Sequence, residues 1–129
     1  MLGNTQQIRK TMKNTYTLER PKNAPSLYST DGHAYKSMVV AHYFLPGTNA
    51  DWFVLEYDPS EDIIFGWAEI IPGCGELGSS SVSELQSIEI AVPIKINGEI
   101  NFIPSKVEFD QHWIPKPLEE ILKARGIKS

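Results

Sequence analysis

Cysteine is almost absent from this sequence of 129 residues: Cys74 stands alone, so no disulfide can form within the chain. A chain without a disulfide framework is typical of a reducing compartment, and we expect a cytoplasmic protein. Long apolar runs are missing too, because Glu56, Gly66 and Pro72 interrupt the best candidates before the roughly 18 residues that a membrane span needs. Residues 1–7 contain no apolar segment, so we expect no secretory signal. The sequence therefore predicts a chain held together by its own hydrophobic core.

Basic residues are absent from the whole middle of the chain. Residues 37–94 contain nine carboxylates and no Lys or Arg, whereas residues 1–36 carry a net charge of +4 and residues 95–129 a net charge of +1. So one-sided a block creates a negative field that repels nucleic acid. It is compatible with an ordinary solvated acidic face, or with an acidic surface that binds a basic partner.

Apolar, β-branched and aromatic runs are present and predict strands. The strongest pair is residues 51–58 and 63–71, joined by a turn at 59–62 and followed by a loop over 72–81. Residues 37–45 predict a preceding strand, so three consecutive strands form an antiparallel meander. The Asn97–Gly98 pair predicts a second hairpin over 94–103, because both residues tolerate the positive φ angles of a type I′ turn.

Two helices are expected near these strands. Ser81 and Glu84 match a capping box and predict a short helix over 82–87, with Leu85 and Ile88 turned inward. Residues 117–125 predict a C-terminal helix with a buried stripe at Leu118, Ile121 and Leu122. The expected fold class is α+β, with an antiparallel sheet of about five strands made from the meander and the second hairpin. We expect a flexible basic arm over residues 1–24, in which Ile8, Met12 and Tyr16 could line a weak amphipathic helix, and a single domain over residues 25–129.

The glycine-rich segment from Gly73 to Gly78 reads G-x-G-x-x-G, the pattern of a dinucleotide-binding turn. No strand–helix–strand unit surrounds it, and Glu76 places a negative charge where a pyrophosphate would bind. We therefore interpret the glycines as turn residues. Cys74 lies between two of them, yet no spacing ties His33, His42 or His112 to it, so the sequence does not predict a nucleophilic site. We expect no cofactor and no metal.

Carboxylates and tryptophans of the strong hairpin are the candidate functional residues. Glu56 and Asp58 share one face of their strand, and Asp62 comes back across the turn. Trp52 and Trp67 could form a cross-strand pair, in the core or at a contact surface. The candidate partner-binding residues are Trp52, Glu56, Asp58, Glu61, Asp62, Trp67 and Glu76. Convergent carboxylates could instead bind a hard cation or divide into an acid and a base.

Several strings occur in an order and spacing that resemble a known family over roughly residues 25–105. They are Leu27-Tyr28-Ser29-Thr30, Phe44-Leu45-Pro46, residues 51–59, Phe65-Gly66-Trp67, Glu76-Leu77-Gly78 and Ser83-Glu84-Leu85. The family they resemble is a domain of unknown function, number twenty-nine fifty-eight, found in bacteria, plasmids and phages. Its members tend to have aromatic residues where this chain has Ser79 and Ser80. The resemblance implies no catalytic residue, but it implies the setting of a mobile element that acts on host machinery.

Three functional hypotheses follow. We favour a non-enzymatic interaction protein of a phage or plasmid that binds and inhibits a basic host protein, such as a nucleic-acid-binding defence protein, through its acidic block. The alternative is a small metal-dependent or acid/base enzyme centred on Glu56, Asp58 and Glu76, with His42 as a further candidate. Direct nucleic-acid binding is expected only through the basic arm, whose bases are Arg9, Lys10, Lys13, Arg20 and Lys22.

Overall fold

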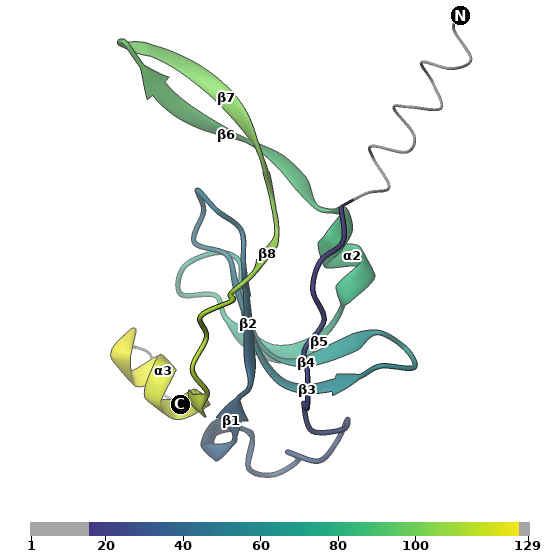
Figure 1. Ribbon diagram of the computed structural model, residues 1–129. Coiled ribbons are helices and arrows are strands. Elements are labelled where there is room, and N and C mark those ends of the chain that lie inside the picture. The colour runs from purple at the N-terminus through teal and green to yellow at the C-terminus, as the bar shows by residue number, and fades with distance from the viewer. Residues whose placement is uncertain (1–15, 127–129) are drawn as a thin grey trace, which may run out of the picture.

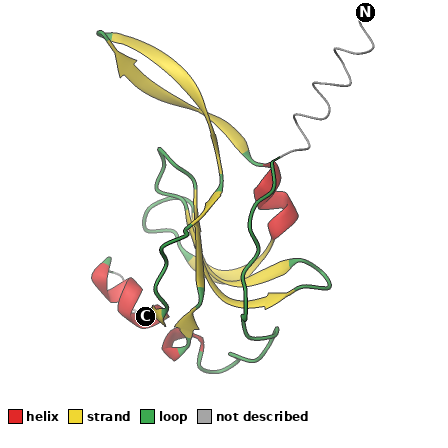
Figure 2. Cartoon of the chain, viewed as in Figure 1, coloured by secondary structure: helices red, strands yellow, loops and turns green. Residues whose placement is uncertain are grey.

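The computed structural model describes residues 16–126, in which strands predominate (Figures 1 and 2). In chain order the elements are the 3₁₀ turn η1 (Ala34–Lys36), β1 (Met38–Val39), β2 (Ala41–Phe44), β3 (Asp51–Asp58), β4 (Ile63–Glu69), β5 (Glu76–Ser81), α2 (Val82–Ser87), β6 (Glu89–Ile96), β7 (Glu99–Lys106), β8 (Glu108–Phe109), β9 (Lys116–Pro117) and α3 (Leu118–Ala124). Among these elements no helix is long and apolar enough to cross a membrane.

The main sheet has five antiparallel strands in the order β5-β4-β3-β2-β8. The α+β class and the meander of β2, β3 and β4 are therefore confirmed. Two members of the sheet differ from the prediction: β5 and β8 complete it, whereas the second hairpin, β6–β7, forms a separate two-stranded sheet. A third small sheet pairs β1 with β9.

The segment 76–81, predicted as part of a loop, is strand β5. Its sequence Glu-Leu-Gly-Ser-Ser-Ser has low β-propensity, so no strand is predicted there from local pattern. Pairing with the strongly formed β4 imposes the extended conformation, from Ile63 opposite Ser81 to Ala68 opposite Glu76. Tertiary pairing has overridden local propensity here.

Helices α2 and α3 pack on opposite faces of the main sheet (Figures 1 and 2). Helix α2 has the predicted bounds and the predicted N-cap, because the backbone N–H of Glu84 donates to the Ser81 hydroxyl at 3.3 Å. It places Val82 and Leu85 in one core, beside Trp52, Val54 and Ile64. Helix α3 begins at Leu118, with Pro117 at its N-cap position. Its three predicted apolar residues are buried in the second core: Leu118, Ile121 and Leu122.

The predicted pairing of Trp52 with Trp67 is wrong. Trp52 lies opposite Ala68, and Trp67 lies opposite Phe53, so the two indoles occupy adjacent rows and point to opposite faces of the sheet. Each belongs to a different core, and they are only 5% and 8% exposed. Core packing, the other interpretation of these residues, is what the structure shows.

Residues 16–24, which the sequence assigned to the basic arm, lie against the main body. Leu18 is 2% exposed within the core that α2 covers, and its backbone N–H donates to the Gln86 side chain at 2.9 Å. Arg20 forms an ion pair with Asp62 at 2.7 Å. The rest of the predicted arm, with Ile8, Arg9 and Met12, lies outside the described residues.

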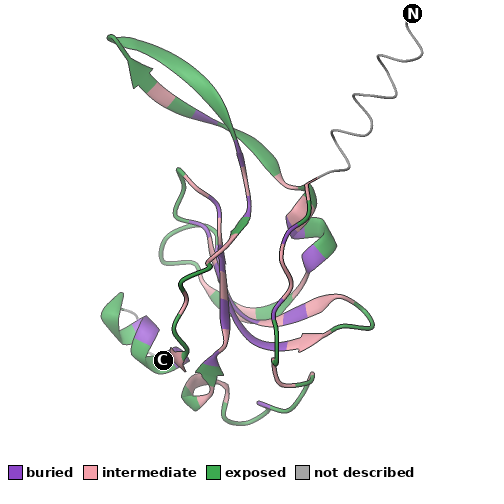
Figure 3. Cartoon of the chain, viewed as in Figure 1, coloured by how far each residue is buried: buried purple, intermediate pink, exposed green. Residues whose placement is uncertain are grey.

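Strands β6 and β7 extend away from the main body as a twisted ribbon (Figure 1). Asn97 and Gly98 have φ angles of 51° and 83°, as the predicted type I′ turn requires. Figure 3 shows that most of the ribbon is exposed. Its base is fixed where Ser105 donates its hydroxyl to the Pro46 carbonyl at 2.7 Å and where Val92 packs beside Gly47.

Candidate partner-binding site

Glu56 is enclosed within the fold, although the sequence placed it among the surface carboxylates. Glu56 is only 2% exposed, and its carboxylate accepts hydrogen bonds from the backbone N–H groups of Tyr28 and Thr30, both at 2.8 Å. The Thr30 hydroxyl donates to it as well. A carboxylate that accepts several hydrogen bonds inside the fold organises the loop that surrounds it. Glu56 therefore holds the 28–30 turn against β3.

Asp62 is also engaged within the fold. Arg20 donates to both of its carboxylate oxygens, at 3.1 and 2.7 Å, and the Tyr57 hydroxyl donates at 2.7 Å. The hydrogen bond from Arg20 holds the pKa of Asp62 below its ordinary value of 3.8. Burial, together with the negative charge of Asp62, raises the pKa of Tyr57. This bidentate pair ties the segment before the sheet to the β3–β4 turn.

Asp58, Glu61 and Glu76 remain at the surface, but the sheet register separates them. Asp58 lies in the row of Ile63 and Ser81, whereas Glu76 lies in the row of Ala68 and Trp52. Six positions of β3 separate the two rows, which is roughly 20 Å at about 3.3 Å per residue. With Glu56 buried, the three acids of the enzyme hypothesis do not converge on one point. The nine acids likewise do not make one continuous face, because Glu56 and Glu69 are buried and Asp51 pairs with Arg125 of the C-terminal helix.

His42 belongs to a polar cluster on the face covered by α3. Its Nε2 lies 2.7 Å from Asp51 and its Nδ1 lies 3.0 Å from Asp110, while Arg125 donates to the second oxygen of Asp51 at 2.7 Å. Burial alone would raise the pKa of Asp51, but the hydrogen bonds from His42 and Arg125 outweigh it and lower that pKa. Because both ring nitrogens of His42 face carboxylates, neither is available as a base for a nucleophile.

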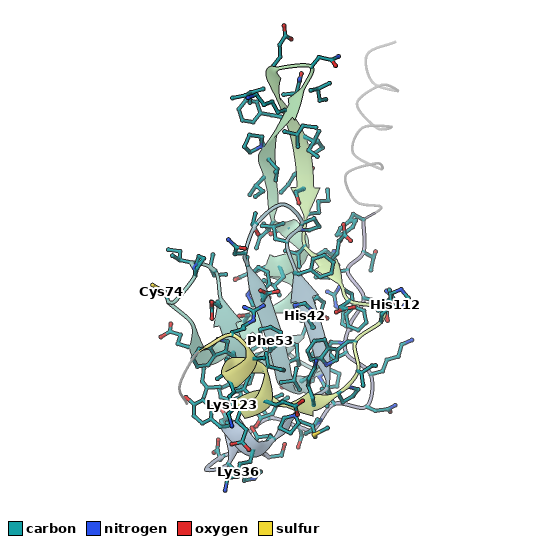
Figure 4. The ribbon with its side chains drawn as sticks, turned by 90° about the vertical axis from the view of Figure 1, so that its left-hand side faces the viewer. Lys36, His42, Phe53, Cys74, His112 and Lys123 are labelled. Atoms are coloured by element: carbon teal, nitrogen blue, oxygen red, sulfur yellow. The ribbon has the colours of Figure 1, made fainter. Side chains whose placement is uncertain are left out.

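Cys74 lies in the exposed loop before β5, well separated from His42 (Figure 4). His112 lies on another side of the molecule. These labelled residues do not form a nucleophile–base pair. Within residues 16–126, no group of three His, Cys, Asp or Glu side chains is arranged to hold a metal ion.

The outer edge of β5 is the most open part of the main sheet. Strand β5 ends the strand order, so along the described chain no further strand pairs with it. The backbone N–H of Val82 donates to the Asp62 carbonyl at 3.0 Å, which makes Ile63 and Ser81 a non-hydrogen-bonded pair. Counting back along the ladder, the N–H groups of Leu77 and Ser79 point away from β4 and toward this edge. Strand β5 contains no proline and no Lys, the usual devices that discourage edge pairing.

A groove of about 540 Å³ lies between β5 and α2. Small side chains from β5 give it room, and its walls are mainly apolar; the lining residues are Trp52, Ile63, Ile70, Ser79, Ser80, Ser81, Glu84, Leu85 and Ile88. Its volume is within the range of clefts that bind ligands. Ile70 and the neighbouring Ile71 are 54% and 64% exposed, so apolar surface continues along the loop that leads to β5.

The charge around this groove is negative. Glu84 lies in its wall, Glu76 begins the open strand, and both are exposed. No base occurs anywhere in residues 37–94, which supply the whole groove. We use the name β5 site for the outer edge of β5, the groove between β5 and α2, and the carboxylates of Glu76 and Glu84 beside them. Of the residues selected from the sequence, only Glu76 lies on β5; the serines and Ile88 were missed, because their roles depend on β5 being a strand next to α2.

Comparison with known proteins matches the chain to a protein family. A family model described as "Protein of unknown function (DUF2958)" covers residues 6–109. No curated protein and no solved structure matches the chain.

Proposed function

The chain belongs to the DUF2958 family, and because that family is one of unknown function, we propose from the geometry of the chain itself that it is a non-enzymatic interaction protein. In this proposal a partner protein adds an extended segment to the open edge of β5. The observation that carries it is the outward-facing backbone of Leu77 and Ser79 beside an apolar groove. Peptides that add a strand obtain affinity from backbone hydrogen bonds and specificity from pockets for alternate side chains.

The charge of the β5 site supports a basic partner. Glu76 and Glu84 flank the position of the added strand, and neither forms an ion pair within the described part of the chain. A partner segment with Lys or Arg next to an apolar anchor would place positive charge on these carboxylates and an aliphatic or aromatic group in the groove. This retains the basic partner expected from the sequence and replaces the broad acidic block by a defined site.

We further propose that the partner is a host protein in the cytoplasm, such as a nucleic-acid-binding defence protein, that a phage or plasmid protein inhibits. Nucleic-acid-binding proteins carry the basic surfaces that the β5 site would attract. The mobile-element setting comes from the family resemblance of the sequence. Occupation of a basic surface by this chain would compete with the phosphate backbone for the same residues.

The proposal is tested by selection from a library of random peptides against the full chain. We expect enriched peptides to combine Lys or Arg with an apolar residue at alternate positions. Binding of a selected peptide should fall by at least about tenfold in Ser79→Pro, which removes an outward N–H, and remain within about twofold in Ser79→Ala, which keeps it. Circular dichroism and thermal melting establish that each variant is folded.

A second pair of variants tests the charge. Glu84→Lys in the groove should weaken binding several-fold, and more strongly at low salt than at high salt, because the interaction is partly electrostatic. Glu119→Lys on α3 makes the same charge change at an exposed position away from the site and should leave binding unchanged. Equal binding by wild type, Ser79→Pro and Glu84→Lys would exclude the β5 site as the place of contact.

A further inference from the structure

The ribbon of β6 and β7 exposes apolar side chains on a structure too thin to bury them itself. Each strand has eight residues, and a two-stranded sheet alone is marginally stable in water. Half of the large apolar residues exposed in the described structure are in the ribbon: Ile90, Ile96, Ile100, Phe102 and Ile103. Exposed apolar surface of this kind marks a contact region.

One face of the ribbon is almost wholly exposed. Opposite residues of an antiparallel pair point to the same side, so this face contains the pairs Glu89–Lys106, Ala91–Pro104, Pro93–Phe102 and Lys95–Ile100. We call it the proline face. Phe102 and Ile100 on it are 65% and 66% exposed. The opposite face is partly covered at its base, where Val92 and Ser105 contact the Pro46–Gly47 turn.

Pro93 and Pro104 disfavour a partner strand at the edges of the ribbon and favour a partner that packs on its proline face. In a hairpin with a two-residue turn, Ile96 and Glu99 form a hydrogen-bonded pair, so Pro93 and Pro104 fall at non-hydrogen-bonded pairs. The nitrogen of each proline therefore points to an outer edge of the ribbon and offers no donor there. Addition of a further strand is disfavoured on both edges. A partner must pack on the side chains.

The charges of the proline face are complementary to those of a second copy. Glu89 lies on β6 at the base of the ribbon and Lys95 lies on the same strand near its tip. When two proline faces pack about a two-fold axis across the ribbon, β6 of one copy runs antiparallel over β6 of the other. Lys95 of each copy then meets Glu89 of its partner, while the prolines and Phe102 meet in the middle. Within the described residues Lys95 has no ion pair, and Glu89 has only an exposed pair with Lys106 at 3.7 Å.

We propose that the chain forms a two-fold dimer through the proline faces of its β6–β7 ribbons. This surface is separate from the β5 site, so either can be correct without the other. Eight residues of rise and two strands of width give a face of roughly 300 Å² per copy, which is in the range of weak interfaces. We therefore expect a weak dimer that dissociates on dilution.

Complementary charge reversals test the dimer by sedimentation of the full chain over a concentration series. Wild type should become dimeric as concentration rises. Lys95→Glu and Glu89→Lys each replace two attractions by two repulsions and should each weaken self-association by about tenfold or more. The two variants mixed in equal amounts should recover dimer at wild-type concentrations, because each then meets its opposite charge. Lys123→Glu on α3, distant from the ribbon (Figure 4), is the matched control and should dimerise like wild type.

The outcomes separate the dimer from other uses of the ribbon. Failure of wild type to associate at any concentration would overturn the proposal and assign the proline face to a different occupant. Association that persists in both single variants, or a mixture no more dimeric than its components, would place the interface elsewhere. A dimer lost in the single variants and restored in the mixture supports the predicted contact of Lys95 with Glu89. Peptide binding at β5 is measured separately and does not decide this result.

Discussion

Glu56 shows how one buried carboxylate can organise a loop. Its oxygens accept the backbone N–H groups of Tyr28 and Thr30, and Tyr28 has a positive φ of 69°, a conformation that non-glycine residues adopt rarely. The hydrogen bonds to Glu56 stabilise this turn in a conformation that its own sequence would seldom choose. Asp58, another carboxylate of the same strand, is only partly buried and accepts hydrogen bonds from the backbone N–H and the hydroxyl of Ser60 in its own turn.

Replacement of Glu56 tests this structural role. Glu56→Ala leaves two backbone donors without their acceptor, and we expect it to lower the free energy of unfolding by about 2–4 kcal/mol. Glu61→Ala, at an exposed position of the β3–β4 turn, should change it by less than about 0.5 kcal/mol. Urea unfolding followed by tryptophan fluorescence measures both. Similar midpoints for the two variants would contradict the role assigned to Glu56.

At the scale of elements, the main sheet depends on a close approach between β3 and β4. Gly66 lies between Val54 of β3 and Gly78 of β5. A Cβ atom at Gly66 would lie 1.8 Å from the carbonyl oxygen of Phe53, which is backbone and cannot rotate away. A Cβ atom at Gly78 would meet nothing within 4 Å. Of these two paired glycines, Gly66 has no space for a side chain, whereas Gly78 has.

This pair gives an internally controlled prediction for the sheet. Gly66→Ala should lower the free energy of unfolding by at least about 3 kcal/mol or prevent folding, because β3 and β4 must separate to admit the methyl group. Gly78→Ala should stay within about 1 kcal/mol of wild type. Thermal melting of both variants measures the difference. Two equally stable variants would show that β3 and β4 are not packed as described.

At the scale of the whole molecule, ion pairs join segments distant in sequence. Arg125, at the end of α3, reaches Asp51 at the start of β3, and Asp51 in turn contacts His42 of β2. Asp110, after β8, contacts the other side of the same ring. On the side of the opposite core, the ion pair between Arg20 and Asp62 joins the first described segment to the β3–β4 turn. These contacts fix the C-terminal helix and the first described segment to the two faces of the sheet.

The pKa values of these carboxylates predict how stability depends on pH. The pKa values of Asp51, Asp62 and Asp110 are lowered in the folded protein from an ordinary value of 3.8. A group with a lowered folded-state pKa contributes stability above its unfolded-state pKa, and that contribution is lost as the pH falls through the folded-state pKa. We therefore expect the free energy of unfolding to decline below about pH 4.

The variant Asp51→Asn isolates the contribution of the Asp51 carboxylate to the pH dependence of stability. We expect it to lower the free energy of unfolding by about 1–3 kcal/mol at pH 7 and by less at pH 2.5, where wild-type Asp51 is also losing its charge. Urea titrations between pH 2.5 and 7 measure the difference. An Asp51→Asn deficit that grows as the pH falls would contradict the lowered pKa.

The strand and helix segments with local sequence patterns could be predicted from the amino-acid sequence alone. The hairpin of β3 and β4, the Asn97–Gly98 turn, the capped helix at 82–87 and the buried stripe of the C-terminal helix follow from side-chain periodicity and turn chemistry. The acidic block was visible as composition. Composition, however, does not indicate which carboxylates turn inward.

The arrangement of those segments and charges depends on tertiary contacts. Pairing with β4 made a strand of a serine-rich segment, and the sheet register separated Asp58 from Glu76 and turned Trp52 and Trp67 to opposite faces. The β5 site exists because β5 ends the sheet beside α2. The ribbon is exposed because, among the strands of residues 16–126, β6 and β7 pair only with each other. Each of these depends on contacts between residues distant in sequence, whose energies no local pattern contains.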